Sequence, residues 1–256
     1  MTWDERQRAM LAEMGYRLPA VGHAVEAVIE VEPEPEPIAV AAPPPVVMRV
    51  AAPTAPTAPA PAAQPTRLAG LDLRALREAV MSGQACGGCE HRVHLFGRGA
   101  EQQVNWLVVT DPPEEADETA AHLLSGNAGR LLDRMLKAAG LGLEGEGANA
   151  FVASIVTGRA PRGRAPQPRE LDAGEAVLAR QSELLRPRLV LAMGLQAARR
   201  LTGSAEPLGK LRGRVHRWRD LPLVVTYHPA YLLRSPADKA GAWNDLRLAM
   251  HTLESS

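Results

Sequence analysis

Four short apolar runs, separated by stretches with helical periodicity, constrain the fold of this chain more than any other feature. The runs are VNWLVVT (104–110), NAFVASIV (149–156), RLVLAMG (188–194) and LPLVVTYH (221–228). Each gives way to glycine, proline or polar residues, as buried parallel strands do. The stretches with helical periodicity lie at 127–139, 170–186, 195–202 and 238–253.

Strands that alternate with helices predict an α/β fold. We expect a three-layer α/β/α sandwich with a central four-stranded parallel sheet. In such sheets a ligand binds beyond the carboxyl ends of the strands. The residues that directly follow each apolar run are therefore the candidate site residues.

The composition of the chain changes near residue 66. Between Glu30 and Pro65 almost every residue is Pro, Ala, Glu or Val. Proline lacks a backbone donor and cannot continue a helix or a central strand, so this stretch predicts an extended linker. We expect a short amphipathic head at 1–17, a Pro/Ala/Glu-rich disordered linker at 18–66 and one domain at 67–256.

The head carries Met10, Leu11 and Met14 with charged residues between them. This pattern is typical of a short amphipathic helix, and such a helix on a tether docks into a groove of a protein partner. A frayed terminus is the alternative.

The formal net charge is zero, but the two signs are unevenly distributed. Of 29 acids and 29 Lys/Arg, residues 1–66 hold eight and four, which leaves 21 acids and 25 Lys/Arg for residues 67–256. The arginines of the domain gather at 159–169 and 199–219. A basic cluster is most often solvated surface, but two clusters beside a strand-end site favour contact with the phosphates of DNA.

No stretch approaches the roughly 20 apolar residues of a membrane span. The N-terminus also lacks the positive flank and apolar run of a signal peptide. We expect a cytoplasmic protein with no membrane partner. The two cysteines, Cys86 and Cys89, form one CxxC, a spacing that suits a metal half-site or a redox pair.

Polar residues mark the ends of the first and last apolar runs. Asp111 follows the first run, and His228 ends the fourth. A single histidine at a strand end is more often a capping or packing residue. Here Pro229 fixes the next turn, and two leucines beside an arginine follow (232–234). Exposed leucines at this edge suit a wedge that enters a base stack.

The run TYHPAYLLR (226–234), with the Pro–Lys–Trp–Asp–Leu pattern at 236–246, is similar to the closing motif of the iron–sulfur, family-four branch of the uracil-DNA glycosylases. Segments 126–141, 159–168 and 186–203 and the pair Arg212-Gly213 resemble other parts of that family in unbroken order. The resemblance extends from about Ala85 to Leu253.

The resemblance implies DNA repair by cleavage of the N-glycosidic bond of deoxyuridine. Asp111 would be the carboxylate near the sugar, and His228 would donate to the uracil oxygen. Leu232 or Leu233 would be the wedge that holds the extruded base out of the duplex. The residues that would contact DNA are Arg159, Arg162, Arg164, Arg212, Leu232, Leu233 and Arg234.

The sequence departs from the family at the base-binding positions. TDPPE (110–114) stands where the family has GEAPG, so Asp111 keeps a carboxylate while Thr110 and Glu114 replace glycines. The stacking phenylalanine falls on Leu124 and the uracil-reading asparagine on Ser154. Serine is too short for the paired amide contacts that separate uracil from cytosine. These changes predict an activity that is weakened or lost, or directed to a related base.

The positions of the iron–sulfur cluster ligands also depart from the family. Cys86 and Cys89 match the early pair of the family, but the two later cysteines fall on Gly158 and Gly174. Two thiolates do not hold a four-iron cluster without outside ligands. We expect no cofactor and a lost iron–sulfur cluster, with a metal shared between chains as the alternative for Cys86 and Cys89.

A second function stays open from the layout of the chain. A short head on a tether before such a domain resembles the psi subunit of the bacterial replicative clamp loader, which has a glycosylase-like fold without catalysis. The alternative to a repair enzyme is therefore a non-catalytic, DNA-associated adaptor.

Overall fold

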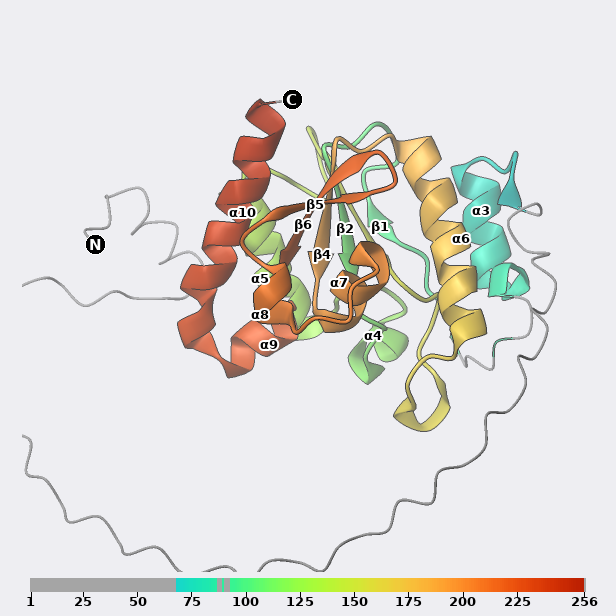
Figure 1. The fold of residues 1–256 in the computed structure, drawn as a ribbon. Helices are drawn as coiled ribbons and strands as arrows, with labels where there is room; N and C mark the ends of the chain where they lie inside the picture. Colours follow the sequence, from blue (N-terminus) through green and yellow to red (C-terminus); the bar gives the residue numbers. More distant parts are fainter. Residues whose placement is uncertain (1–67, 87–88, 90–92, 256) are drawn as a thin grey trace, which may run out of the picture. The chain divides into compact units, whose positions relative to one another are not determined.

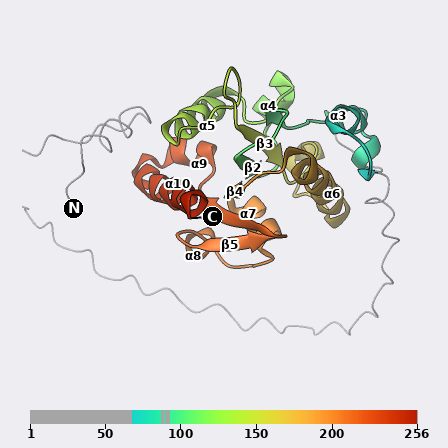
Figure 2. The same cartoon turned by 90° about the horizontal axis from the view of Figure 1, so that it is seen from above.

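The computed structural model describes residues 68–86, 89 and 93–255. These residues form a six-stranded sheet with the strand order β1-β3-β2-β4-β6-β5 and helices on both faces (Figures 1 and 2). The expected head at 1–17 and linker at 18–66 lie outside the described residues.

Four parallel strands form the centre of the sheet. They are β3 (Ala150–Ser154), β2 (Trp106–Thr110), β4 (Leu189–Met193) and β6 (Leu221–Thr226). Thr110 pairs with Ser154 and Met193, and Met193 pairs with Thr226. The strands therefore end at one level, and the residues after them share one edge of the sheet. The predicted fold class is confirmed.

Two short strands that the sequence analysis did not predict extend the sheet. β1 (Arg98–Gly99) lies antiparallel to β3, and β5 (Val215–Trp218) lies antiparallel to β6. β1 is too short to show a period, and the side chains of β5 are mostly exposed, so neither strand reads as an apolar run.

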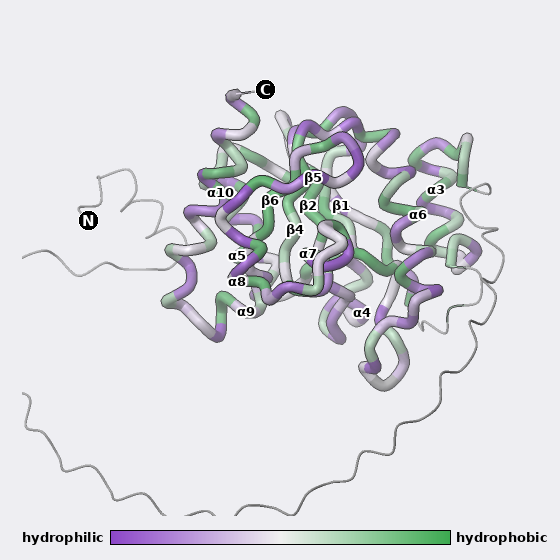
Figure 3. The backbone as a smooth tube through the Cα atoms, in the orientation of Figure 1, coloured by the Kyte–Doolittle hydropathy of each residue, from purple (hydrophilic) through white to green (hydrophobic). Residues whose placement is uncertain are grey.

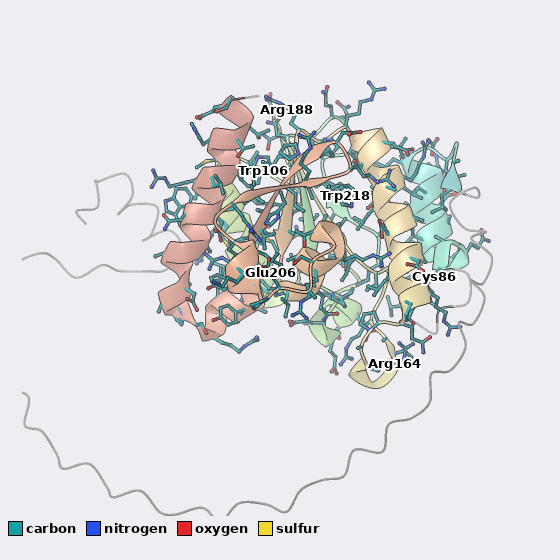
Figure 4. The ribbon with its side chains drawn as sticks, viewed as in Figure 1. Cys86, Trp106, Arg164, Arg188, Glu206 and Trp218 are labelled. Carbon is teal, nitrogen blue, oxygen red and sulfur yellow. A yellow bond between two sulfur atoms is a disulfide. The ribbon has the colours of Figure 1, made fainter. Side chains whose placement is uncertain are left out.

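Two helical layers cover the sheet. One contains α3 (Leu73–Met81), α6 (Pro168–Leu185) and α7 (Leu195–Thr202), and the other contains α5 (Gly126–Ala138), α9 (Pro229–Arg234) and α10 (Lys239–Glu254). Figure 3 shows the hydrophobic strands between helices with polar outer faces. Alternate residues of β2 enter the two cores: Leu107 packs in the core that contains α6 residues, and Trp106, labelled in Figure 4, packs in the core that contains α5 residues.

The shorter elements lie in the connections. They are η1 (Gln84–Cys86), α4 (Glu115–Ala120), η2 (Pro161–Gly163), α8 (Leu208–Leu211) and η3 (Pro236–Asp238). None of the helices found in 68–255 is long and apolar enough to cross a bilayer.

Two very short connections position the site. Gly194 alone joins β4 to α7, and Tyr227 and His228 join β6 to α9. Both connections lie at the edge of the sheet where the parallel strands end.

Candidate active site

A cavity of about 320 Å³ lies at the carboxyl edge of the sheet. Its walls come from the segment after β2, the starts of α7 and α8, and the segment from His228 to the end of α9, and ligands of parallel sheets bind at this edge. The lining residues are Asp111, Pro112, Glu114, Gly194, Leu195, Gln196, Leu208, His228, Tyr231 and Arg234. The two predicted catalytic residues therefore share one cavity.

Asp111 is held at the N-terminus of α7. Its Oδ1 accepts a hydrogen bond from the backbone N–H of Ala197 at 2.7 Å. Burial raises the pKa of this carboxyl to about 6, although the backbone N–H groups of Ala197, Gln196 and Leu195 act in the opposite direction. At pH 7 and above the group is therefore mostly a carboxylate, half-buried in the wall of the cavity.

Gly194 makes the position of Asp111 sterically feasible. A Cβ atom at residue 194 would lie 2.2 Å from Asp111 Oδ2, and the φ angle of Gly194 is +105°. Both the close approach and the backbone conformation require glycine. The loop after β4 is therefore shaped around the carboxylate.

His228 is the N-cap of α9 and is neutral. Its Nδ1 accepts the backbone N–H of Ala230 at 3.2 Å, so the proton of the imidazole is on Nε2. Nε2 then donates to Thr110 Oγ1 at 2.9 Å. Burial lowers the pKa of His228 to about 4, which Asp117 partly opposes and Arg234 reinforces. His228 is thus a fixed, uncharged donor near neutral pH.

Ser154 does not line the cavity. Its hydroxyl donates to the backbone oxygen of Asp111 at 3.1 Å, and it accepts the N–H of Val156 at 3.4 Å. The side chain therefore ties β3 to the turn that carries Asp111. No amide stands at this position.

Leu124 lies apart from the cavity that holds Asp111 and His228. It is 3% exposed, packs in the core with α5 and lines a different cavity of about 410 Å³. Its φ of +51° is a left-handed conformation that leucine rarely adopts. The carbonyl of Leu124 would lie 1.9 Å from a Cβ at Gly129, so the start of α5 packs directly on it.

Burial distinguishes the two leucines of α9, which the sequence analysis could not tell apart. Leu232 is 0% exposed and belongs to the core, whereas Leu233 is 42% exposed. Arg234, also exposed, lines the cavity. Leu233 is therefore the leucine whose side chain is exposed and can contact another molecule.

The sequence analysis missed Asp117, which organises the segment between β2 and α5. The buried carboxylate accepts the backbone N–H of Glu114 at 3.1 Å, the N–H of Ser125 at 2.7 Å and the hydroxyl of Ser125 at 2.9 Å. An acid three residues after a helix start is a known capping signal, but the contact with Ser125 cannot be read from spacing.

A protein-family model described as the uracil DNA glycosylase superfamily matches residues 96–247. The chain belongs to this superfamily. It is 28% identical over 186 residues to the type-4 uracil-DNA glycosylase of Pyrobaculum aerophilum, covering 70% of this chain and 93% of the relative.

Two further relatives carry the same description. The type-4 uracil-DNA glycosylase of Saccharolobus solfataricus is 26% identical over 193 residues, 72% of this chain and 87% of the relative. That of Thermotoga maritima is 32% identical over 130 residues, 50% of this chain and 65% of the relative. The resemblance to the family-four branch is confirmed.

Most of the arginines expected to contact DNA in this superfamily member are paired within the chain. Arg159 lies 3.7 Å from Glu115 and 3.6 Å from Glu118. Arg164 makes two hydrogen bonds, at 2.9 and 2.8 Å, with the buried carboxylate of Glu170 on α6 (Figure 4).

Arg212 also forms a salt bridge, with 2.7 Å between its Nε and Oδ2 of Asp245. The side chain of Arg162 lies outside the described residues. In the described part of the chain, Arg234 is the expected DNA-contacting arginine for which no ion pair is found.

The residues at the expected cluster positions do not fit four-cysteine ligation. The Cys86 and Cys89 sulfur atoms are joined as a disulfide beside α3 and α6 (Figure 4). Gly158 is buried and bridges the backbone of His94. A Cβ atom at Gly174 would lie 2.0 Å from the carbonyl oxygen of Ile155.

Helix α6 is therefore in backbone contact with the segment after β3, and no side chain fits at residue 174. Glycine itself supplies no ligand atom. Among residues 68–86, 89 and 93–255, no group of three or more His, Cys, Asp and Glu is placed to hold a metal ion.

Proposed function

We propose that this protein is a DNA-repair glycosylase that removes uracil, or a related base, by hydrolysis of the N-glycosidic bond. The observation that carries the proposal is the presence of a neutral histidine donor, His228, and a half-buried carboxylate, Asp111, in one cavity at the strand ends. The uracil DNA glycosylase superfamily and the type-4 uracil-DNA glycosylases to which the chain is similar have the same chemistry.

His228 would stabilise the leaving base. As the glycosidic bond breaks, negative charge develops on the carbonyl oxygen of the base, and a donor that is already positioned stabilises this charge without reorganisation. Because the pKa of His228 is lowered to about 4, the imidazole stays neutral and donates through Nε2. A base oxygen would take the place that Thr110 Oγ1 occupies in the free protein.

Asp111 would act on the sugar side of the same bond. A carboxylate beside a sugar stabilises oxocarbenium character or orients the attacking water. The N-terminus of α7 fixes its Oδ1 through Ala197, which leaves Oδ2 toward Gly194. The buried charge is thus held in one orientation before the substrate arrives.

Three departures from the family would make this enzyme slow. Thr110 Oγ1 competes for the His228 donor. Ser154 has no side-chain amide to read the base, and its hydroxyl already donates to the backbone oxygen of Asp111. Glu114 adds a negative charge to the cavity wall, which repels a phosphate.

We further propose that the enzyme works without an iron–sulfur cluster. The closed packing at Gly174 and the absence of a ligand atom at both Gly158 and Gly174 support this. DNA would be held by Arg234, which lines the cavity, and by the exposed Leu233 that precedes it on α9. A DNA partner agrees with the cytoplasmic location that the sequence predicts.

The test is single-turnover cleavage of a uracil-containing oligonucleotide by excess full-length protein. We expect His228→Ala to lower the rate by about 10²- to 10³-fold, the usual effect of removing one donor to a developing oxyanion. His251→Ala is the matched control, because His251 is an exposed histidine of α10. Ser154→Asn should raise the rate on uracil relative to cytosine.

Equal rates for the wild type and His228→Ala would refute the assigned role of His228. A wild type that binds DNA but cleaves no base would favour the second function instead, a non-catalytic adaptor that engages a protein partner through residues 1–17. The observation that favours the adaptor is that Thr110 and the α7 backbone already engage His228 and Asp111.

A further inference from the structure

Tyr227 lies at the centre of a stack beside the cavity. The guanidinium carbon of Arg212 is 3.7 Å from the Tyr227 ring centroid. The Tyr231 ring stacks on Tyr227 with 4.9 Å between centroids and an interplanar angle of 26°. Distances this short leave room for one group per ring face, so Arg212 and Tyr231 occupy opposite faces of Tyr227.

Both ends of the stack are fixed by carboxylates. Arg212 Nε donates to Asp245 Oδ2 at 2.7 Å, and the Asp245 side chain is only 3% exposed. The Tyr231 hydroxyl donates to Asp238 Oδ2 at 2.6 Å. The hydrogen bond to Asp238 therefore fixes the orientation of the Tyr231 ring before a ligand binds, which reduces the side-chain entropy that is lost on binding.

The stack ends at the site already described. Tyr227 directly precedes His228, and Tyr231 lines the cavity with Asp111 and His228. Tyr231 is 36% exposed, and one of its faces lies against Tyr227. Its other face has no aromatic or cationic partner among the residues that the structure describes.

We propose that the open face of Tyr231 is a stacking site for an unpaired nucleobase of DNA. A base would stack on Tyr231 as the next layer after Arg212, Tyr227 and Tyr231. Every base has a π-face that can stack on an aromatic side chain. The proposal rests on the proposed function only in taking DNA as the ligand.

The chemistry around Tyr231 matches a nucleobase with its backbone. Arg234 follows Tyr231 by three residues on α9, so it lies on the same side of the helix, and it lines the same cavity as a cation for a phosphate. Asp238 and Glu114 are acidic, and they direct a phosphate backbone toward Arg234. Leu124, at the ring position of the family, faces a different cavity and offers no competing stack.

The test uses full-length protein and a single-stranded oligonucleotide that contains 2-aminopurine and no uracil, so binding is measured without turnover. Removal of one base-stacking ring lowers affinity by about 5- to 150-fold, and we expect a loss in that range for Tyr231→Ala, with less quenching of 2-aminopurine. Tyr231→Phe keeps the ring and should bind within about threefold of the wild type, since it loses only the bond to Asp238.

Two controls separate stacking from other effects. Tyr231→Leu keeps an apolar side chain without a π-face, so it should bind as weakly as Tyr231→Ala. Met81→Ala removes an exposed apolar side chain from α3, which lies far from α9 in both Figure 1 and Figure 2, and should bind like the wild type.

Tyr231→Ala with unchanged affinity and quenching would overturn the stacking site, even if the protein cleaves uracil. Tyr231→Leu that binds as well as Tyr231→Phe would also overturn it, because the contact would then be apolar and not a stack. If Tyr231→Ala loses affinity in a protein that cleaves no base, the stacking site stands and the proposed catalysis fails. A full-length protein that binds no DNA contradicts both.

Discussion

Replacing Asp111 with asparagine should change how the stability of the protein depends on pH. Asparagine keeps the oxygen that accepts the Ala197 N–H but cannot ionise. In the wild type, burial raises the pKa of Asp111 from 3.8 to about 6. The folded protein therefore holds this proton over a range in which the unfolded chain has lost it, and wild-type stability falls as the pH rises through that range.

The magnitude follows from the shift. About two pKa units correspond to about 3 kcal/mol of unfolding free energy in full, of which about 2 kcal/mol is lost between about pH 4.5 and pH 7. The advantage of the wild type over Asp111→Asn should shrink by about this amount across the same range. Asp220→Asn, an exposed change in the β5–β6 turn, should show no such trend.

The wild type must be compared with variants because His228 changes the stability with pH in the opposite direction to Asp111. Its pKa is lowered from 6.5 to about 4, so the unfolded chain binds the proton that the folded protein rejects, and stability rises with pH by about 2 kcal/mol over the same range. The two effects nearly cancel in the wild type. His228→Gln should remove the rise and expose the fall that Asp111 causes.

The assay is urea unfolding followed by circular dichroism at half-unit steps from pH 4.5 to pH 8. If the difference in unfolding free energy between the wild type and Asp111→Asn is the same at every pH, the α7 backbone N–H groups fully offset the desolvation of the Asp111 carboxylate. The pKa of Asp111 would then not be raised in the folded protein, and its carboxylate would not be a desolvated charge before catalysis.

Three other changes test the surroundings of the site. Thr110→Ala frees Nε2 of His228 and should raise single-turnover cleavage by about 5-fold, the value of one net hydrogen bond, and a lower rate would show that Thr110 positions the histidine. Asp117→Ala removes three buried hydrogen bonds and should lower the unfolding free energy by about 3 kcal/mol, measured by urea unfolding; a loss below about 0.5 kcal/mol would contradict its organising role. Gly174→Ala places a Cβ 2.0 Å from the Ile155 oxygen and should cost about 1–3 kcal/mol, whereas a neutral change in melting temperature would show that α6 has room to move.

The sequence was sufficient to predict the central sheet and its main helices. Apolar runs and helical periods do not depend on distant contacts, so β2, β3, β4 and β6 and helices α5, α6, α7 and α10 lie close to their expected ranges. The edge strands β1 and β5 were missed because their pairing, and not their composition, defines them.

The placement of Asp111 and His228 in one cavity also followed from the sequence, since both residues come directly after parallel strands. Side-chain partners did not follow. The pairing of Arg164 with Glu170 and of Arg212 with Asp245 brings together residues from different elements, and charge clustering alone cannot reveal it.

The same limit applies to α9 and to the cluster positions. Leu232 and Leu233 differ only in which side of α9 each occupies, and the burial of Leu232 depends on α5 and α10. Glycine at residue 174 shows from the sequence that a ligand is missing, but only the packing against Ile155 shows that the space is closed.

The most direct measurement of the central claim is identification of the products. Excess full-length protein is incubated with a uracil-containing oligonucleotide, and free base and abasic DNA are measured by mass spectrometry. The account predicts free uracil and an equal amount of abasic site, formed by the wild type and nearly abolished in His228→Ala. Intact oligonucleotide after prolonged incubation with bound wild-type protein, or equal product from both proteins, would contradict it.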